Sequence, residues 1–177
     1  MRRRVLWVSL GVTFLSAAIA LGWGGMRDLA ADRLVEQARA RLEAPLREAP
    51  GLDRIQASTA LSLLERAEAL GRSDDELIGL HAYASALEDY QRGDLVLAEG
   101  ELTSARHRLG PNADVLALAA AVARGRSRDA DAHALLAEAL ELDPDNAHAR
   151  LLAADIAIDG ERGAVALEHL DVLLEQA

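Results

Sequence analysis

The chain has 177 residues, of which 51% are hydrophobic and only 3% aromatic, and its formal net charge is −10. Without cysteine it has no disulfide, thiolate zinc site or cysteine nucleophile, and because all 19 basic residues are arginine it has no phosphate-loop lysine or Schiff-base lysine. The acidic balance argues against nucleic-acid binding. Alanine (37 residues) and leucine (32 residues) dominate, which favours helix over sheet.

Residues 1–26 have the features of a transmembrane signal-anchor. Three arginines at positions 2–4 precede 22 residues without a charge. As a helix these 22 residues would be about 33 Å long, enough to cross a hydrocarbon core of about 30 Å. Trp7 and Trp23 stand near the two ends of the stretch, where interfacial aromatic residues belong.

A cleaved signal peptide is the alternative, because Ala18-Ile19-Ala20 fits the small-x-small pattern of a cleavage site. The apolar stretch is longer than the usual signal core of about 7–15 residues, which favours the uncleaved anchor. In both cases the N-terminal arginines stay in the cytoplasm by the positive-inside rule. We therefore expect a single-pass protein of the plasma (inner) membrane with an extracytoplasmic (periplasmic) C-terminal domain.

Beyond the anchor, 16 arginines stand against 29 acidic residues, a net charge of −13. The charges are dispersed, and we interpret them as a solvated surface rather than as a site for a basic partner. Residues 27–72 are expected to form a divergent helical hairpin or a cap. Apolar residues recur there at helical spacing in two segments, Leu29, Leu34, Ala38 and Leu42 in the first and Ile55, Leu63, Leu64, Ala67 and Leu70 in the second.

Six further helices are marked by caps and breakers. Ser73 and Glu76 have the spacing of a capping box and predict a helix that runs to about Arg92. Gly93-Asp94 starts the next helix, which ends at Gly110-Pro111-Asn112. Two more hairpins follow, with breaks at residues 125–127, 144–146 and 160–163.

A 34-residue period organises the second part of the chain. The positions that repeat at this interval are Ala86, Ala120 and Ala154; Ala98, Ala132 and Ala166; Leu102, Leu136 and Leu170; and Ala105, Ala139 and Leu173. Small residues allow helices to cross closely, and leucines one turn later fill the adjacent layer. Such a period predicts stacked helical hairpins.

These residues resemble the tetratricopeptide repeat (TPR) family. Residues 132–146 are similar to the family's second helix and its Pro-x-Asn turn, and Gly93-Asp94 with the residues up to 105 is similar to its interhelix turn and second helix. The resemblance implies an all-α fold in which the N-terminal transmembrane helix precedes a TPR-like helical-hairpin solenoid. The solenoid covers residues 73–177 as three repeats, at about 79–112, 113–146 and 147–177.

The resemblance also implies a partner groove lined mainly by the first helix of each hairpin. Arg124 and Arg150 are candidates for this groove. Tyr83, Leu87 and Tyr90 join them in one of two registers. In the other register, which we favour, the tyrosines belong to the core, because the groove register leaves Asp89 on a buried face.

No motif for catalysis or for a cofactor is present in the sequence, and none of the five histidines pairs with another at metal-ligand spacing. His148 is the histidine nearest the expected groove, and we interpret it as a solvated residue of the first helical turn. We therefore expect no enzyme, no cofactor and no metal site.

The function implied by the resemblance is that of a membrane-anchored scaffold or adaptor that binds a peptide or a partner subunit. Assembly of envelope complexes and secretion-associated chaperoning both fall within the family's range. A self-associating structural protein is an alternative, because Leu170, Leu173 and Leu174 leave an apolar edge on the last helix. A soluble periplasmic binder released after Ala20 is another.

Overall fold

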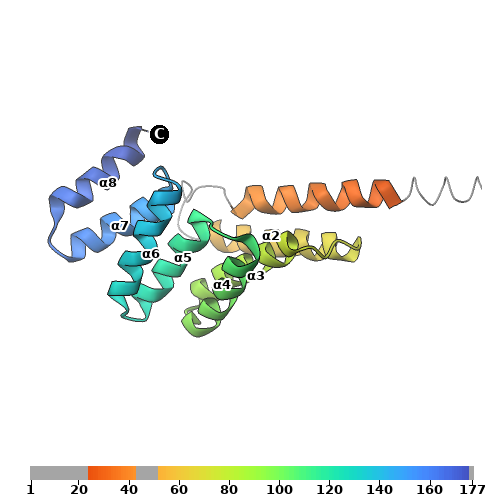
Figure 1. Cartoon of the computed structure of the whole chain (residues 1–177), viewed down its shortest axis with the longest axis horizontal. Helices are drawn as coiled ribbons and strands as arrows, with labels where there is room; N and C mark the ends of the chain where they lie inside the picture. The colour runs from red at the N-terminus through yellow and green to blue at the C-terminus, as the bar shows by residue number, and fades with distance from the viewer. Residues whose placement is uncertain (1–23, 43–51, 176–177) are drawn as a thin grey trace, which may run out of the picture.

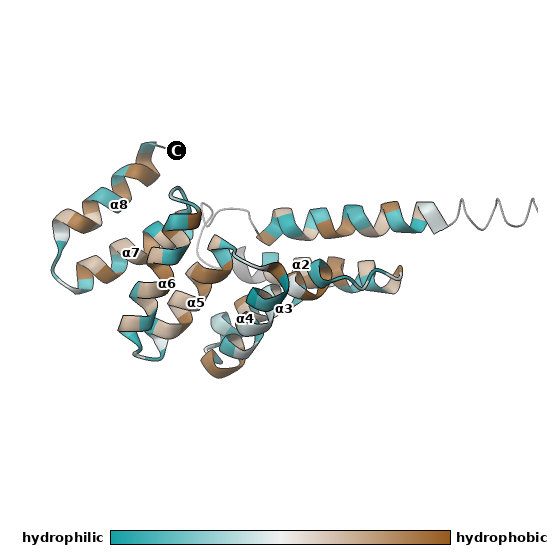
Figure 2. Ribbon diagram, in the orientation of Figure 1, coloured by the Kyte–Doolittle hydropathy of each residue, from teal (hydrophilic) through white to brown (hydrophobic). Residues whose placement is uncertain are grey.

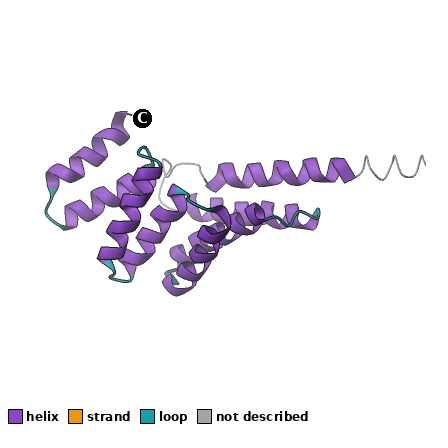
Figure 3. Ribbon diagram, in the orientation of Figure 1, coloured by secondary structure: helices purple, strands orange, loops and turns teal. Residues whose placement is uncertain are grey.

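The computed structural model describes residues 24–42 and 52–175, and side chains in the second range from residue 56 onward. All regular structure in these two ranges is α-helical (Figure 3). The first helix, here called the N-terminal helix, covers residues 24–42. The other helices are α2 (Leu52–Ala69), α3 (Asp75–Arg92), α4 (Leu95–Leu109), α5 (Ala113–Gly125), α6 (Asp129–Leu142), α7 (Ala147–Asp159) and α8 (Gly163–Glu175).

The eight described helices pack as consecutive antiparallel pairs, so the all-α prediction is confirmed. The N-terminal helix lies beside α2, and α3, α5 and α7 each pack against the helix that follows them (Figure 1). The first helices of successive hairpins also touch, α3 with α5 and α5 with α7. The hairpins therefore stack in a row.

The predicted anchor falls almost entirely outside the described residues, which include only its last three positions. Within the described ranges, no helix is both long enough and apolar enough to cross a membrane.

The alanines of the 34-residue period form the centre of the array. Ala86, Ala120 and Ala154 are buried on the first helices of their hairpins, and Ala98, Ala132 and Ala166 are buried on the second helices. Leu102 and Leu136 are buried one turn later. Since a methyl group is all that stands between the crossing backbones, the paired helices can approach closely, and a larger side chain at these positions would force them apart.

The N-terminal helix packs largely through the face that was expected, with Leu34 against the core, and it differs at one residue. Its buried residues are Ala31, Val35, Ala38 and Leu42, whereas Leu29 is 63% exposed. With 3.6 residues per turn, Leu29 lies about 150° away from this stripe. The prediction for Leu29 was therefore wrong, although Ala38 and Leu42 are buried as expected; Figure 2 shows the alternation of hydrophobic and hydrophilic residues along the helix.

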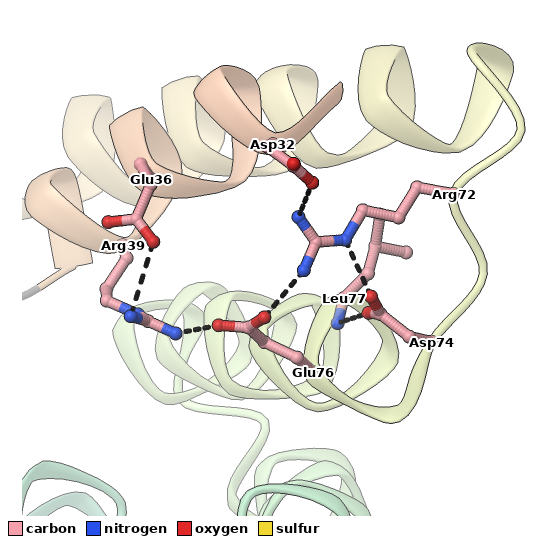
Figure 4. Close-up of polar contacts among 7 residues, drawn as sticks. All are labelled: Asp32, Glu36, Arg39, Arg72, Asp74, Glu76 and Leu77. Atoms are coloured by element: carbon pink, nitrogen blue, oxygen red, sulfur yellow. Dashed lines mark hydrogen bonds and ion pairs between the residues drawn. The ribbon is translucent and has the colours of Figure 1, made fainter. Parts of the chain in front are cut away.

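One arginine joins the N-terminal helix to the start of α3 (Figure 4). The Arg72 guanidinium lies 2.8 Å from Asp32 Oδ1, 2.7 Å from Asp74 Oδ2 and 2.6 Å from Glu76 Oε2. Arg39 of the N-terminal helix pairs with the other oxygen of Glu76. Because the Arg72 side chain is largely buried, these contacts are less screened than ordinary surface ion pairs.

The same cluster determines where α3 begins. Asp74, rather than Ser73, is the N-cap residue, and its Oδ1 accepts a hydrogen bond of 2.9 Å from the Leu77 amide. The predicted capping box was thus wrong by one residue, because Glu76 pairs with Arg72 and Asp74 is itself a strong N-cap. The predicted end of this helix at Arg92 is confirmed.

The three turns inside the hairpins from α3 to α8 repeat one backbone conformation. Each contains a residue with positive φ, and these residues are 34 positions apart: Gly93 (+85°), Ser127 (+59°) and Glu161 (+56°). The bond that closes each turn joins an amide to the carbonyl five residues earlier, Asp94 to Asp89, Arg128 to Ala123, and Arg162 to Ala157. This is the pattern of a Schellman motif, which glycine adopts with less strain than serine or glutamate.

Replacing Ser127 by glycine is therefore expected to raise the free energy of unfolding by about 0.5–1 kcal/mol, because it relieves the left-handed strain. The reverse change, Gly93→Ser, should lower it by a similar amount, since a Cβ at Gly93 meets no atom within 4 Å and only the backbone strain is altered. Urea denaturation of the full chain in detergent, followed by circular dichroism, measures both. Equal midpoints for the three proteins would contradict the expectation.

The charge of Asp74 should make stability depend on pH. Burial raises the pKa of this carboxyl, but hydrogen bonds from the Leu77 amide and the Arg72 guanidinium, with the Arg72 charge, bring the pKa below its ordinary value of 3.8. A lowered pKa in the folded state stabilises the protein above pH 3.8, and this contribution is lost as the pH falls through the folded-state value.

We expect Asp74→Asn, which keeps an N-cap side chain but removes the charge, to lower the free energy of unfolding at pH 7 by about 0.5–1 kcal/mol. The difference from the unmodified protein should shrink towards pH 3 in urea titrations. Asp145→Asn, at an exposed position, serves as the matched control. A difference that stays constant from pH 7 to pH 3 would show that the charge is not responsible.

Candidate partner groove

The first helices of three successive hairpins line a groove of about 540 Å³. Helices α3, α5 and α7 provide nearly all of its wall, and α8 adds Leu170. The lining residues are Leu87, Tyr90, Gln91, Ala117, Leu118, Ala121, His148, Leu151, Leu152, Ala154, Asp155, Ile158 and Leu170. Because these helices contact one another in sequence, the groove is part of the folded array and needs no rearrangement to form.

The groove is mainly apolar and is open at its rim. Leu118 is buried at its base, and Leu87 and Leu152 are partly buried. The large side chains Tyr90, Leu151 and Ile158 stay exposed around it. A concave apolar surface with a few polar groups at its edge is typical of sites that bind a peptide or a helix.

His148, Gln91 and Asp155 supply the groove's polar lining. The prediction that His148 is simply solvated needs correction, because it is partly buried and lines the groove. In the described ranges, no group of three or more His, Asp or Glu side chains could hold a metal ion. The groove can therefore bind a ligand through its shape and its apolar area, with a few hydrogen-bonding groups at its edge.

The structure separates the two tyrosines that the sequence placed together. Tyr83 is only 4% exposed and belongs to the core, whereas Tyr90 is 37% exposed and lines the groove with Leu87. Each register was thus right for one tyrosine. The buried residues of α3 end at Ala86, so its last part opens to the groove. Asp89 is partly buried and pairs with Arg92.

The two candidate arginines do not line the groove in the described part of the chain. Arg124 of α5 donates to the carboxylates of Asp155 and Asp159 on α7. The hydrogen bond to Asp155 is the main cause of its raised pKa. Arg150 donates from Nε to the carbonyl of Pro144 at 2.6 Å. Arg124 therefore holds two groove helices together instead of facing a ligand.

The 34-residue period could have identified some of the groove residues that the sequence analysis missed. Leu87, Ala121 and Asp155 are spaced at this interval and all line the groove. Leu118 and Leu152, which are also 34 residues apart in the sequence, line the groove as well. Extending the period from Leu87 would have indicated the equivalent positions on α5 and α7.

A buried asparagine fixes α7 against α5. Asn146 Oδ1 accepts a hydrogen bond of 2.9 Å from the Ala149 amide, and its Nδ2 donates to Asp114 Oδ1 at 2.8 Å. The side chain thus caps α7 and links it to the preceding hairpin. Asn112 caps α5 in the same way, through the Val115 amide at 3.0 Å.

Asn146→Ala should therefore destabilise the array more than Asn112→Ala. Loss of a cap alone costs about 1 kcal/mol, and Asn146→Ala also leaves the partly buried Asp114 without its donor, so we expect about 2 kcal/mol. Urea titration of each variant, with hydrogen exchange to locate the change, measures this. Equal losses for the two variants would mean that the bond to Asp114 contributes nothing.

These features define a class of protein: an all-α chain of stacked antiparallel hairpins whose first helices line one apolar groove. Compared with models of known families, the chain matches none. No curated protein matches it either.

Proposed function

We propose that this protein is a membrane-anchored, extracytoplasmic TPR-like scaffold that binds a peptide or a partner subunit in the groove of α3, α5 and α7. The groove itself is the observation that carries the proposal. It joins three hairpins, is mainly apolar and has about 540 Å³ of space, enough for several side chains of an extended or helical segment.

The TPR assignment is supported by the 34-residue recurrence of three independent features. These are the buried alanines, the positive-φ turns at Gly93, Ser127 and Glu161, and the groove positions. A repeat that preserves core, turn and concave surface at one interval is the expected arrangement of a helical-hairpin solenoid.

The membrane anchor is supported by the sequence of residues 1–26, with its basic start and uncharged stretch. Tethering raises the local concentration of the groove, so moderate affinity is sufficient for function. Envelope assembly and secretion-associated chaperoning remain the two settings that we propose. N-terminal sequencing of the mature protein distinguishes the anchor from cleavage after Ala20.

The groove is further suited to binding because its helices are fixed beforehand. Arg124 and Asn146 link α5 to the following hairpin, so a ligand meets a surface that is already ordered. Binding to such a surface costs less conformational entropy than binding to a mobile one.

Photo-crosslinking in the native membrane tests the proposal. With a photoreactive residue at position 121 in the groove, we expect a discrete crosslinked product. The triple change Tyr90→Ser, Leu151→Ser and Ile158→Ser should reduce its yield about tenfold or more, because each exposed apolar side chain adds roughly 1 kcal/mol of burial in the complex.

The matched control is Val96→Ser, Leu97→Ser and Leu142→Ser, which removes three exposed apolar side chains outside the groove. This control should leave the yield unchanged. Equal losses from the two triple variants, or no product from position 121, would refute a groove ligand.

A further inference from the structure

Helix α8 carries a histidine where the preceding hairpin has a leucine. His169 is 34 residues after Leu135 of α6, which is partly buried against the apolar cluster of α5, α6 and α7. His169 is partly buried as well, and its Nδ1 atom is shielded from solvent without a hydrogen-bond partner in the described part of the chain. A neutral imidazole can leave Nδ1 unprotonated, but a protonated ring carries an N–H donor there that would have no acceptor. The position therefore favours the neutral ring.

A second apolar position is also occupied by a basic residue in this hairpin. Arg150 of α7 is the 34-residue equivalent of Leu116 of α5, which is 2% exposed in the same apolar cluster. Arg150 is held at the start of α7, because its Nε donates to the Pro144 carbonyl at 2.6 Å. Two leucines of the α5–α6 hairpin are thus replaced by two basic side chains in the α7–α8 hairpin. Their charges repel each other once His169 is protonated.

The charges that act on His169 come from the two helices of its own hairpin. In the described residues α8 packs against α7, which contributes Arg150, and α8 itself contributes Glu168. Burial is the main cause that lowers the pKa of His169 below its ordinary value of 6.5. The Arg150 charge lowers this pKa further, and Glu168 opposes both effects.

The other titratable groups of α7 and α8 act elsewhere. Two acids of α7 pair with Arg124 of α5, one histidine of α7 lines the groove, and two acids of α8 are exposed to solvent. Protonated His169 would therefore have Glu168, which is itself exposed, as its nearby counter-charge. The groups are, in the same order, Asp155 and Asp159, His148, and Asp171 and Glu175.

The packing that holds α8 against α7 is small (Figure 1). It consists of the buried residues Ala154, Ala157 and Ala166, with Leu170 packed against them, whereas the cluster around α5 and α6 has eight buried residues. Because a hairpin with so little buried apolar area has a low local stability, a modest penalty is enough to release it. Leu170, which follows His169 in the sequence, is also the residue that α8 contributes to the groove wall.

We propose that protonation of His169 loosens α8 from α7 and so withdraws Leu170 from the groove, which makes ligand binding weaker in acid than at neutral pH. The loosened state takes up the proton more readily than the packed state, because its imidazole is solvated. Packing is therefore unaffected above pH 6.5 and is lost as the pH falls from 6.5 towards the lower folded-state value. The effect on a ligand rests on the function proposed above, but the loosening of α8 does not.

Hydrogen exchange at two pH values tests the loosening. The full chain in phosphatidylcholine nanodiscs is exchanged at pH 7 and pH 5, with exchange times scaled for the intrinsic pH dependence, and mass spectrometry gives the protection of each helix. Protection of α8 should fall roughly fivefold or more at pH 5, as expected for a donor left without an acceptor, while α5 and α6 keep theirs. Equal protection of α8 at the two pH values, or an equal fall in α5 and α6, would overturn the inference.

Two substitutions of His169 identify the titrating group. His169→Leu restores the residue type of the preceding hairpin, and His169→Gln keeps a polar side chain that cannot be protonated in this range. Both should abolish the pH difference in α8, so the result does not depend on added apolar area. The matched controls are His133→Gln, at an exposed position on α6, and His148→Gln in the groove, and both should keep the difference. A difference that survives either change at His169, or that either control removes, contradicts the proposal.

Crosslinking from position 121 supplies the groove readout. The yield should be lower at pH 5 than at pH 7 in the unmodified protein, and equal at the two pH values in His169→Leu. A yield that stays constant although the protection of α8 changes would overturn the effect on the groove. No product at either pH would refute the proposed function, and hydrogen exchange would still decide whether His169 loosens α8.

Discussion

The close crossing of helices on alanine is the constraint on which the rest of the structure depends. At Ala98, Ala132 and Ala166 the second helix of each hairpin contributes only a methyl group to the crossing. The backbones can then approach closely, but little apolar area is buried at each crossing, since an alanine removes less surface from water than a leucine. Specific polar links between helices therefore contribute more than they would in a core of large side chains.

Arginine and asparagine side chains make these polar links between helices. Arginine carries five N–H donors in a planar group, which is how Arg72 contacts three carboxylates, one on the N-terminal helix and two at the start of α3, and Arg124 contacts two on α7. The amide of Asn146 donates and accepts at once. A lysine ammonium in these places would supply charge without the fixed geometry that sets the spacing of helices.

Sequence periodicity predicted the helices and their pairing because both depend on local spacing. It also predicted the buried alanines of the repeat, but it misplaced residues at the edge of a buried face, and this is why Leu29 and Tyr90 lie elsewhere than expected. The breaks at residues 125–127 and 160–163 were predicted, but the positive φ of Ser127 and Glu161 was not, because neither residue is the glycine that usually takes this conformation. Arg124 does share its repeat position with Tyr90 and Ile158, but its partners Asp155 and Asp159 lie on another helix, and no local pattern indicates that pairing.

The last hairpin shows how stability and binding are coupled in a stacked array. Stability in such arrays is the sum of each hairpin's own packing and its contacts with neighbours. In the described residues, α7 and α8 share a small cluster of Ala154, Ala157 and Ala166 with Leu170 packed against it, and α8 has no helix on its outer side. Because α7 also lines the groove, the small cluster that holds α8 against α7 affects the groove wall as well as the stability of the array.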